Sequence, residues 1–214
     1  MKNILLFTPR VFSKSESFID NLIFQENNGS QKLLVYHQLF DTEKFNNYEG
    51  VSYQIDWMPR NVAERCFTKA YSMYHSLGNY VFPFASLKKI KTIIQRHHIE
   101  LVHCNFGDSA LKFLPIAEES GIPLVPHFRG YDASKLLLDK TYTKLLRRLF
   151  EASPKVIVVS QNLAENLFQY GLTDEKTVIL PSGIDTAYFK PSQQKVLENQ
   201  PGTKLLHVGR LTEK

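Results

Sequence analysis

Cysteines and long apolar runs are both scarce in this sequence. The 214 residues include only two cysteines, Cys66 and Cys104, too few for a disulfide framework, and Cys104 lies in an apolar run typical of a buried thiol. No segment approaches the roughly 18 apolar residues of a membrane-spanning helix. The run Ile4–Phe7 is too short for the core of a signal peptide. We therefore expect a protein of the reducing cytoplasm whose membrane contact is at most peripheral.

Motifs of several enzyme classes are missing as well. No glycine-rich fingerprint follows the first apolar run, which disfavours a dehydrogenase, and we find no P-loop, no Ser-His-Asp arrangement and no spacing of metal ligands. The formal net charge is +5. This mild basic excess fits an enzyme that contacts phosphates or an anionic membrane, and it equally fits surface charge with no partner. No nucleic-acid partner is expected.

What is present is a series of short apolar runs separated by longer helical patterns. Continuous apolar strands, unlike alternating ones, are typical of a parallel sheet covered on both faces. The seven runs predicted as strands are Ile4–Phe7, Leu33–Tyr36, Val51–Ile55, Leu101–Cys104, Pro123–Val125, Val156–Val159 and Val178–Leu180. Hydrophobic residues make up 43% of the chain, enough for the core of one large domain, although 214 residues are tight for two.

Helical patterns lie between these runs. Apolar stripes at helical spacing cover residues 87–94 and 145–150. Ser160 is expected to cap a helix over residues 161–170, which Gly171 then ends. The repeated strand–helix order predicts an α/β fold with a Rossmann-like, doubly wound parallel sheet.

The composition changes after residue 180. Three prolines punctuate a polar stretch, which we interpret as an interdomain linker over residues 181–203. A fresh apolar run then begins at Leu205. We expect residues 1–180 to form an N-terminal domain and residues 204–214 to begin a second, truncated domain.

Residues that follow the strands are candidates for a site, because ligands of open α/β sheets bind at the carboxyl ends of the strands. Glu16 lies in a polar turn before a helix, where backbone N–H groups can face an anion, but helix capping by Ser15 explains the same turn. His103 follows the fourth run. Its imidazole can bond a hydroxyl or a phosphate near neutral pH, although a lone histidine at a strand end is more often structural.

Three polar groups follow the fifth run. Arg129 offers a planar fork to phosphate or carboxylate, Gly130 lets the backbone turn sharply or approach a ligand, and Asp132 can accept hydrogen bonds from sugar hydroxyls. The alternative for Arg129 and Asp132 is a surface ion pair that contributes little.

Five segments, in order, resemble the retaining family 4 glycosyltransferases of GT-B fold. Ser182–Asp185, with Phe189 and Pro191, is similar to the family's N/S-G-I-D-x-x-x-F-x-P segment. His207–Lys214 is similar to H-V-G-R-L-x-E-K-K-G, which opens the family's second domain.

Within the family, the resemblance is to exopolysaccharide enzymes of the colanic acid and amylovoran type. Ser15–Ile19 is similar to S-E-T-F-I, His103–Gly107 to H-A-H-F-G, and Phe128–Asp132 to F-H-G-Y-D. Two departures from these motifs matter. Asn105 stands where the second histidine of H-A-H-F-G is usual, and Arg129 stands where F-H-G-Y-D has histidine, so the acceptor or sugar is expected to differ.

The resemblance implies two Rossmann-like domains facing a cleft, the first binding mostly acceptor and the second the nucleotide-sugar. It implies sugar transfer with retention, without a metal or another cofactor. It assigns catalytic roles to His103, Arg129 and Asp132. The residues expected to bind substrate are Glu16, Asn105, Gly130, Gly183, Asp185 and Arg210. Arg210 matches the family's diphosphate-binding arginine, and the lysine that accompanies it would follow Lys214.

The resemblance thus predicts transfer of a sugar to an exopolysaccharide, a lipopolysaccharide or a lipid-linked glycan, with this chain inactive alone. A non-catalytic half-domain that binds a glycan or a partner stays open. The segment similar to G-R-L-x-E-K disfavours a GT-B epimerase. Basic helices that contain Lys88, Lys89 and Lys91, or Arg147 and Arg148, are expected to contact the inner face of the plasma membrane.

Overall fold

The computed structural model describes residues 2–13, 16–24 and 30–184, together with residues 186, 190 and 205. Residues Met1–Gly183 form one compact unit and Ile184–Lys214 a second. The predicted linker and the predicted start of a second domain fall almost wholly outside the described residues. Both boundaries therefore stay predictions.

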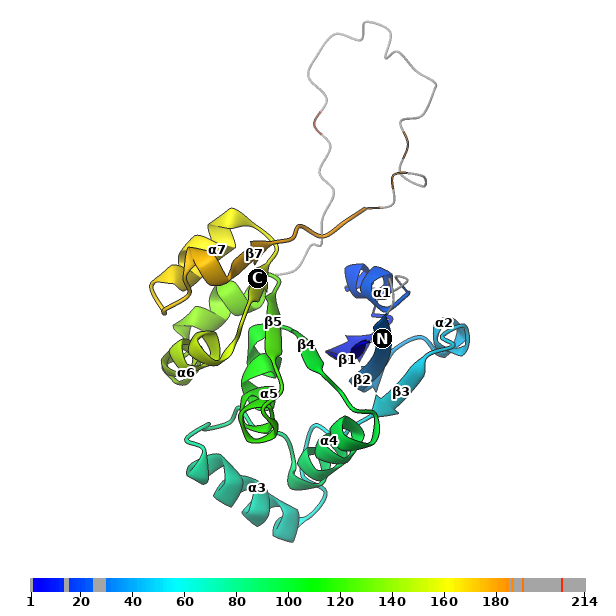
Figure 1. Cartoon of the computed structure of the whole chain (residues 1–214), viewed down its shortest axis with the longest axis vertical. Helices are drawn as coiled ribbons and strands as arrows, with labels where there is room; N and C mark the ends of the chain where they lie inside the picture. The colour runs from blue at the N-terminus through cyan, green and yellow to red at the C-terminus, as the bar shows by residue number, and fades with distance from the viewer. Residues whose placement is uncertain are drawn as a thin grey trace, which may run out of the picture. The chain divides into compact units, whose positions relative to one another are not determined.

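Seven parallel strands of the described residues form one sheet, which confirms the prediction from the apolar runs (Figure 1). Their order is β3-β2-β1-β4-β5-β6-β7, so the chain starts in the middle and adds strands first on one side and then on the other. The strands are β1 (Lys2–Val11), β2 (Ser30–Leu39), β3 (Val51–Gln54), β4 (Leu101–Asn105), β5 (Leu124–Phe128), β6 (Val156–Val158) and β7 (Thr177–Ile179). This is the doubly wound, Rossmann-like topology.

The helices are α1 (Ser17–Phe24), α2 (Thr42–Asn46), α3 (Val62–Tyr74), α4 (Phe84–Arg96), α5 (Gly107–Ser120), α6 (Lys140–Ala152) and α7 (Gln161–Phe168), with short 3-10 helices η1 (Tyr131–Ala133), η2 (Lys135–Leu138) and η3 (Asp174–Lys176). The two predicted apolar stripes are the buried faces of α4 and α6. Ser160 caps α7 by accepting a hydrogen bond from the backbone N–H of Leu163 at 3.4 Å. Within the described ranges, no helix is long and apolar enough to cross a membrane.

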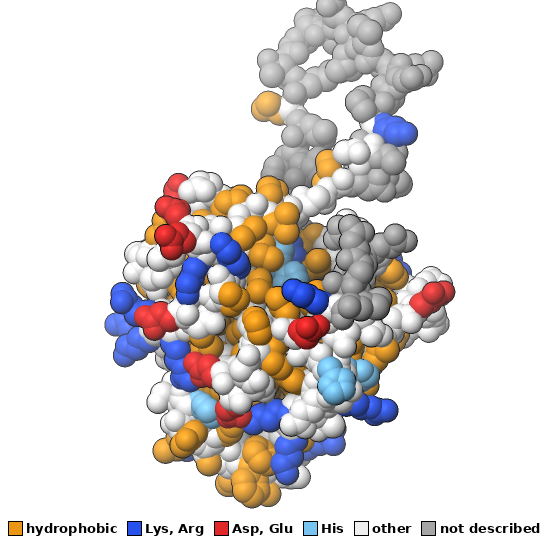
Figure 2. Space-filling model, viewed as in Figure 1, with side chains coloured by type: hydrophobic (Ala, Val, Ile, Leu, Met, Phe, Trp, Pro, Cys, Tyr) orange, Lys and Arg blue, Asp and Glu red, His pale blue; other side chains and the backbone are white. Residues whose placement is uncertain are grey.

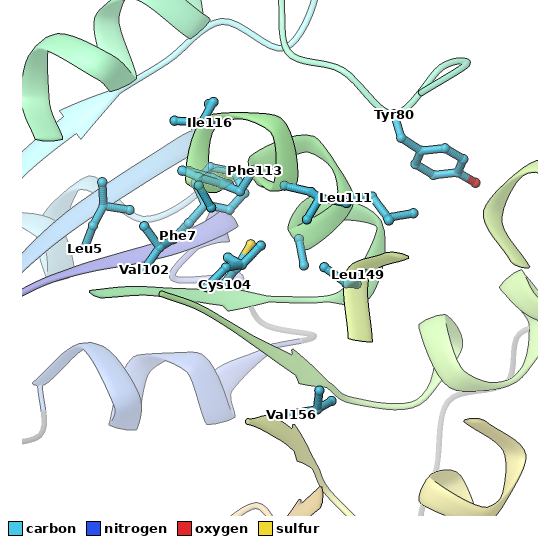
Figure 3. Packing of buried hydrophobic residues seen from close by; sticks show 14 of the residues in the cluster. Leu5, Phe7, Tyr80, Val102, Cys104, Leu111, Phe113, Ile116, Leu149 and Val156 are labelled. Atoms are coloured by element: carbon cyan, nitrogen blue, oxygen red, sulfur yellow. The ribbon is translucent and has the colours of Figure 1, made fainter. Parts of the chain in front are cut away.

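The larger core lies between one face of the sheet and helices α4 to α7. Helix α5 is apolar on nearly all sides and is buried from residue 109 to residue 117, as expected of a helix enclosed by other elements. Figure 3 shows Phe7 of β1 and Cys104 of β4 beside Leu111 and Phe113 of this helix. The ring centroids of Phe7 and Phe113 are 4.9 Å apart.

A smaller core lies on the other face, over β1 and β2. Leu6, Leu34 and Tyr36 of the strands pack there with Ile19 and Ile23 of α1. On this same face, β4 and β5 carry polar rather than apolar side chains near their carboxyl ends. The alternation along these two strands therefore determines where the candidate site lies.

Candidate functional site

Alternation along β4 and β5 brings four polar side chains to one face of the sheet. Cys104 and Phe128 point into the larger core, so His103 and Asn105 on β4, and His127 with Arg129 just after β5, lie on the opposite face. The two strands are paired with Asn105 directly across from His127. This register places the four side chains in one cluster, which we call the strand-end cluster.

Arg129 is the centre of the strand-end cluster. Its Nη2 and Nε both donate to Oδ1 of Asn105, at 2.9 and 3.2 Å. Its Nη1 donates to Oγ of Ser182 at 3.4 Å, and its guanidinium carbon lies 4.6 Å from the centroid of the Phe18 ring, within the range of a cation–π contact. One N–H of Nη1 has no partner among the residues that the structure describes, so the guanidinium keeps a donor for an anion.

His103 and His127 form a hydrogen-bonded pair beside Arg129. The Nε2 atom of His103 lies 3.2 Å from Nδ1 of His127, and Nη2 of Arg129 lies 3.3 Å from the same Nδ1. Since a guanidinium only donates, Nδ1 of His127 is assigned as the acceptor and Nε2 of His103 as a donor. His103 is thus not the lone histidine that the sequence suggested.

Burial holds both imidazoles neutral. The pKa of His103 is lowered to about 4, mainly by burial and then by the positive charges of Arg129 and Lys32. The pKa of His127 is lowered to about 2, mainly by burial and then by the electrostatic effects of Arg129 and His103. Burial also lowers the pKa of Arg129 to about 10, against the opposing effects of Asp132 and Glu16, so Arg129 is charged at neutral pH. The cluster therefore presents one cation and two neutral imidazoles.

The position of Asp132 differs from what we expected. The sequence suggested that its side chain accepts hydrogen bonds from sugar hydroxyls or, alternatively, that it pairs with Arg129 at the surface. Its residue surface is only 1% exposed. Its Oδ1 accepts the backbone N–H groups of Arg129 and Gly130, each at 2.9 Å, and its Oδ2 accepts that of Gly107 at 2.8 Å. The contact with Arg129 is thus to its backbone and not to its guanidinium. Because backbone donors occupy both oxygens, the carboxylate joins the two strand-end loops.

The turn from β4 into α5 is conformationally demanding. Phe106 has a φ of 70°, which is rare for a residue with a bulky side chain and costs about 1–3 kcal/mol. A Cβ on Gly107 would lie 2.2 Å from Oη of Tyr142 and 2.4 Å from the Phe128 ring, so only glycine fits there. The turn lets the N–H of Gly107 point at Asp132.

A pocket of about 440 Å³ opens beside the strand-end cluster. Side chains from α1, the end of β5 and the segment after β7 line it: Phe18, Asn21, Leu22, His127, Arg129, Leu180, Pro181, Ser182 and Gly183. Arg129 and Gly183 are therefore pocket residues, whereas His103 and Asn105 contact the pocket residues without lining it. Among the described residues, and apart from the chain neighbours, no heavy atom lies within 4 Å of the position of a Cβ on Gly130 or Gly183, so a ligand can approach the backbone at both.

Glu16 stands just before α1. Its Oε1 accepts a hydrogen bond from Arg10 at 3.0 Å, and its Oε2 is buried without a hydrogen-bond partner among the described residues. The other predicted residues, Asp185 and Arg210, lie outside the described residues. Sequence reasoning overlooked His127 and Phe18 as site residues. The signal for His127 was its position two residues before Arg129, which puts both side chains on one face.

No group of three or more His, Cys, Asp or Glu side chains that could hold a metal ion occurs in the part of the chain that is described. What the strand-end cluster offers instead is an arginine with an unused donor, neutral imidazoles and an amide, next to a pocket. These groups suit an anionic and hydroxyl-bearing ligand.

Solved structures share this architecture. HepE of Anabaena, in complex with UDP and glucose, is 14% identical, with a TM-score of 0.64 over 90% of this chain and 47% of HepE. Sucrose-phosphate synthase of Thermosynechococcus elongatus is 11% identical, with a TM-score of 0.60 over 90% of this chain and 51% of the synthase. UDP-GlcNAc 2-epimerase of Neisseria meningitidis, bound to UDP-GlcNAc, is 14% identical, with a TM-score of 0.52 over 84% of this chain and 45% of the epimerase.

Identities this low show the fold alone, which is a Rossmann-like half of the GT-B type. The chain spans about half the length of these structures. Because an epimerase shares the fold, the fold does not separate transferase from epimerase. None of the curated proteins compared with the chain matches it. Residues 49–188, well over half of the sequence, match the profile of Glycosyltransferase Family 4, and the chain belongs to that family.

Proposed function

We propose that this chain is the acceptor-side half of a retaining glycosyltransferase that moves a sugar from a nucleotide-sugar to an exopolysaccharide, a lipopolysaccharide or a lipid-linked glycan. The observation that carries the proposal is the strand-end cluster. Arg129 keeps an unused donor beside a pocket, and neutral histidines adjoin it. Family membership supports the transferase class, and the UDP and glucose bound to HepE support a nucleotide-sugar.

Each group of the cluster has a task in this proposal. Transfer with retention requires stabilisation of the departing diphosphate and of positive charge at the anomeric carbon. Arg129 binds an anionic group of donor or acceptor, because a guanidinium fork suits phosphate. His103, neutral at physiological pH, holds a sugar hydroxyl by a hydrogen bond. His127 and Asn105 orient these two residues, and both already contact Arg129.

The remaining predicted residues take supporting roles. The open backbone at Gly130 and Gly183 binds substrate, and Glu16 is proposed as a substrate-binding residue on the resemblance alone. We propose Asp132 as a positioning residue rather than a sugar ligand, since its oxygens hold three backbone N–H groups. Asp185 and Arg210 are proposed as donor-binding residues on the resemblance alone.

Transfer is further proposed to depend on a second domain of the kind that completes the matched structures. The test is an assay of radiolabelled sugar incorporation into lipid-linked glycan or polysaccharide, using UDP-sugars and the protein that contains this chain. We expect incorporation by that protein and none by residues 1–214 alone. Hydrolysis or isomerisation of the UDP-sugar without transfer to any acceptor would overturn the proposed function.

A further inference from the structure

Helix α3 is oriented with its polar side chains toward the protein. Thr68 accepts the backbone N–H of Phe84 at 3.0 Å, and Glu64 accepts that of Ala85 at 3.0 Å. Tyr71 donates to Glu119 at 2.8 Å. These hydrogen bonds attach α3 to α4 and α5, together with the ring of Phe67, which stacks at its edge on the Phe84 ring of α4 with centroids 5.4 Å apart.

The outward side of α3 is apolar. At 100° per residue, seven residues form one continuous exposed face, which we call the α3 apolar face: Val62, Ala63, Cys66, Phe67, Ala70, Met73 and Tyr74. Four large side chains on it are 60–85% exposed, namely Val62, Phe67, Met73 and Tyr74. Figure 2 shows the hydrophobic side chains at the lower edge of the molecule, where α3 lies in Figure 1. Surface helices normally have the reverse pattern, so a contiguous exposed patch of this kind marks an interaction surface.

Cations border the α3 apolar face. Arg65 and Lys69 lie on one flank of the helix and also line a pocket of about 680 Å³ behind it. Lys112 of α5 lines the same pocket, with its ammonium 4.1 Å from the centroid of the Trp57 ring. Lys112 is only 9% exposed and has no hydrogen bond to any described residue. The described residues that line this pocket include no acidic side chain, so the charge of the lining favours an anion.

We propose that the α3 apolar face docks on an anionic phospholipid bilayer, with Arg65 and Lys69 directed at lipid phosphates. An interfacial helix combines an apolar face with flanking cations and aromatic residues in this way. A second copy of the chain fits less well, because an antiparallel two-fold contact through this face would bring the cations of both copies together. The inference deepens the proposed function, since a lipid-linked acceptor lies in such a bilayer.

The basic helices predicted to contact the membrane are less suited to it. Lys91 is paired with Glu119, and Arg148 with Glu118. Lys89 donates to the backbone carbonyl of Gln54 at 2.7 Å. These cations are committed to intramolecular contacts, which leaves α3 as the better surface.

Cys66 provides a native reporter at the centre of the α3 apolar face. It is exposed whereas Cys104 is buried, so an environment-sensitive thiol fluorophore labels Cys66 selectively. Vesicles of phosphatidylglycerol and phosphatidylcholine should shift the emission of labelled protein to shorter wavelength, and vesicles of pure phosphatidylcholine should leave it unchanged. In the control, Cys66→Ser with Lys135→Cys, the label sits on η2 and no vesicle should shift its emission.

Vesicle flotation of variants separates the contribution of the apolar side chains of this surface from that of its cations. Phe67→Ser with Met73→Ser should weaken binding at least tenfold, and Arg65→Gln with Lys69→Gln roughly fivefold per charge. Leu138→Ser, at a residue 85% exposed on η2, is the matched control and should bind normally. Circular dichroism should show that all variants are folded, as expected for exposed substitutions.

Several results would overturn the proposal. One is no binding to anionic vesicles, and another is equal binding to neutral ones. A third is a vesicle-independent dimer, or a tight complex with another protein, that Phe67→Ser with Met73→Ser abolishes. These assays need no sugar transfer. Vesicle binding without transfer therefore rejects only the proposed function, and transfer without vesicle binding rejects only this inference.

Discussion

Asn105 and Arg129, each of which replaces a histidine of the motifs of similar exopolysaccharide enzymes, are hydrogen-bonded to each other. One amide oxygen of Asn105 accepts from both Nη2 and Nε of Arg129, at 2.9 and 3.2 Å. The departures therefore form one matched pair on adjacent strands. An arginine in place of histidine brings a permanent charge, and the amide holds its guanidinium in a fixed orientation.

Replacement of Arg129 by alanine should lower kcat/KM for sugar transfer about ten- to a hundred-fold. The reason is the loss of a charge-assisted contact that contributes about 1.5–3 kcal/mol. Steady-state kinetics on the protein that contains this chain is the measurement, with a melting curve for each variant. Arg147→Ala, at an exposed arginine of α6, is the matched control and should be unaffected.

Two further variants sharpen this test. Arg129→His should retain more activity than Arg129→Ala, because it restores the residue of the related motif. Asn105→Ala should couple to Arg129→Ala by about 0.5–3 kcal/mol in a double-mutant cycle, as contacting residues do. Wild-type kinetics for Arg129→Ala would remove Arg129 from the proposed site, and additive effects with Asn105→Ala would contradict the coupling of the two residues.

The neutral histidine pair predicts acid sensitivity of the fold. The pKa of His103 is about 4 and that of His127 about 2 in the folded chain, against roughly 6.5 when unfolded. Between about pH 4 and 6.5 the unfolded chain binds more protons, so stability should fall as the pH falls through this range. Urea unfolding at several pH values should show this slope. His103→Gln should flatten it, whereas Lys135→Gln should not, and an unchanged slope in His103→Gln would reject the assignment.

Asp132→Asn should destabilise the fold. An asparagine presents an N–H group where the carboxylate now accepts from Gly107 or from Arg129 and Gly130. A cost of about 1.5–3 kcal/mol corresponds to a melting temperature lower by roughly 3–12 °C. Asp174→Asn, at an exposed aspartate of η3, should melt with the wild type. Loss of transfer without any loss of stability would instead favour direct sugar contact by Asp132.

Gly107→Ala should be strongly destabilising, because its methyl group would overlap Oη of Tyr142 and the Phe128 ring. Tyr142→Phe removes the closest atom, at 2.2 Å, and should partly rescue Gly107→Ala in a melting experiment. Gly183→Ala has open space at the Cβ position and should melt normally. Equal melting of Gly107→Ala and wild type would show that the turn repacks freely.

Transfer is expected to proceed without a metal ion, as the family resemblance implies. Activity should persist after dialysis against EDTA, and added Mg²⁺ or Mn²⁺ should not raise it beyond the effect of ionic strength, with matched KCl as the control. Activity that EDTA abolishes and one divalent metal restores would contradict this expectation.

The sheet could be predicted because most of its strands contain a short apolar run such as Val156–Val158, as expected where both faces of a parallel sheet are covered. Helix α3 could not be predicted in the same way. Its apolar residues face outward, whereas an argument from hydrophobic periodicity assumes that the apolar side of a helix faces the core. The contact of Arg129 with Asn105 follows from strand alternation and register. The contact of buried Asp132 with Gly107 could not be predicted. It is made at a turn where Phe106 has a positive φ, and the composition of the sequence does not reveal such a backbone conformation.

The hydrogen bonds of Asp132 to Gly107, Arg129 and Gly130 have a consequence for engineering substrate range. The loops after β4 and β5 share one carboxylate, so a relative's sequence grafted into only one of them would leave buried backbone donors without an acceptor. Residues 103–107 and 127–132 should therefore be exchanged together, as a single cassette. The segment 180–183 makes none of these bonds to Asp132, and it contacts the cassette through the hydrogen bond from Nη1 of Arg129 to Ser182, so it can be varied separately if Ser182 is kept.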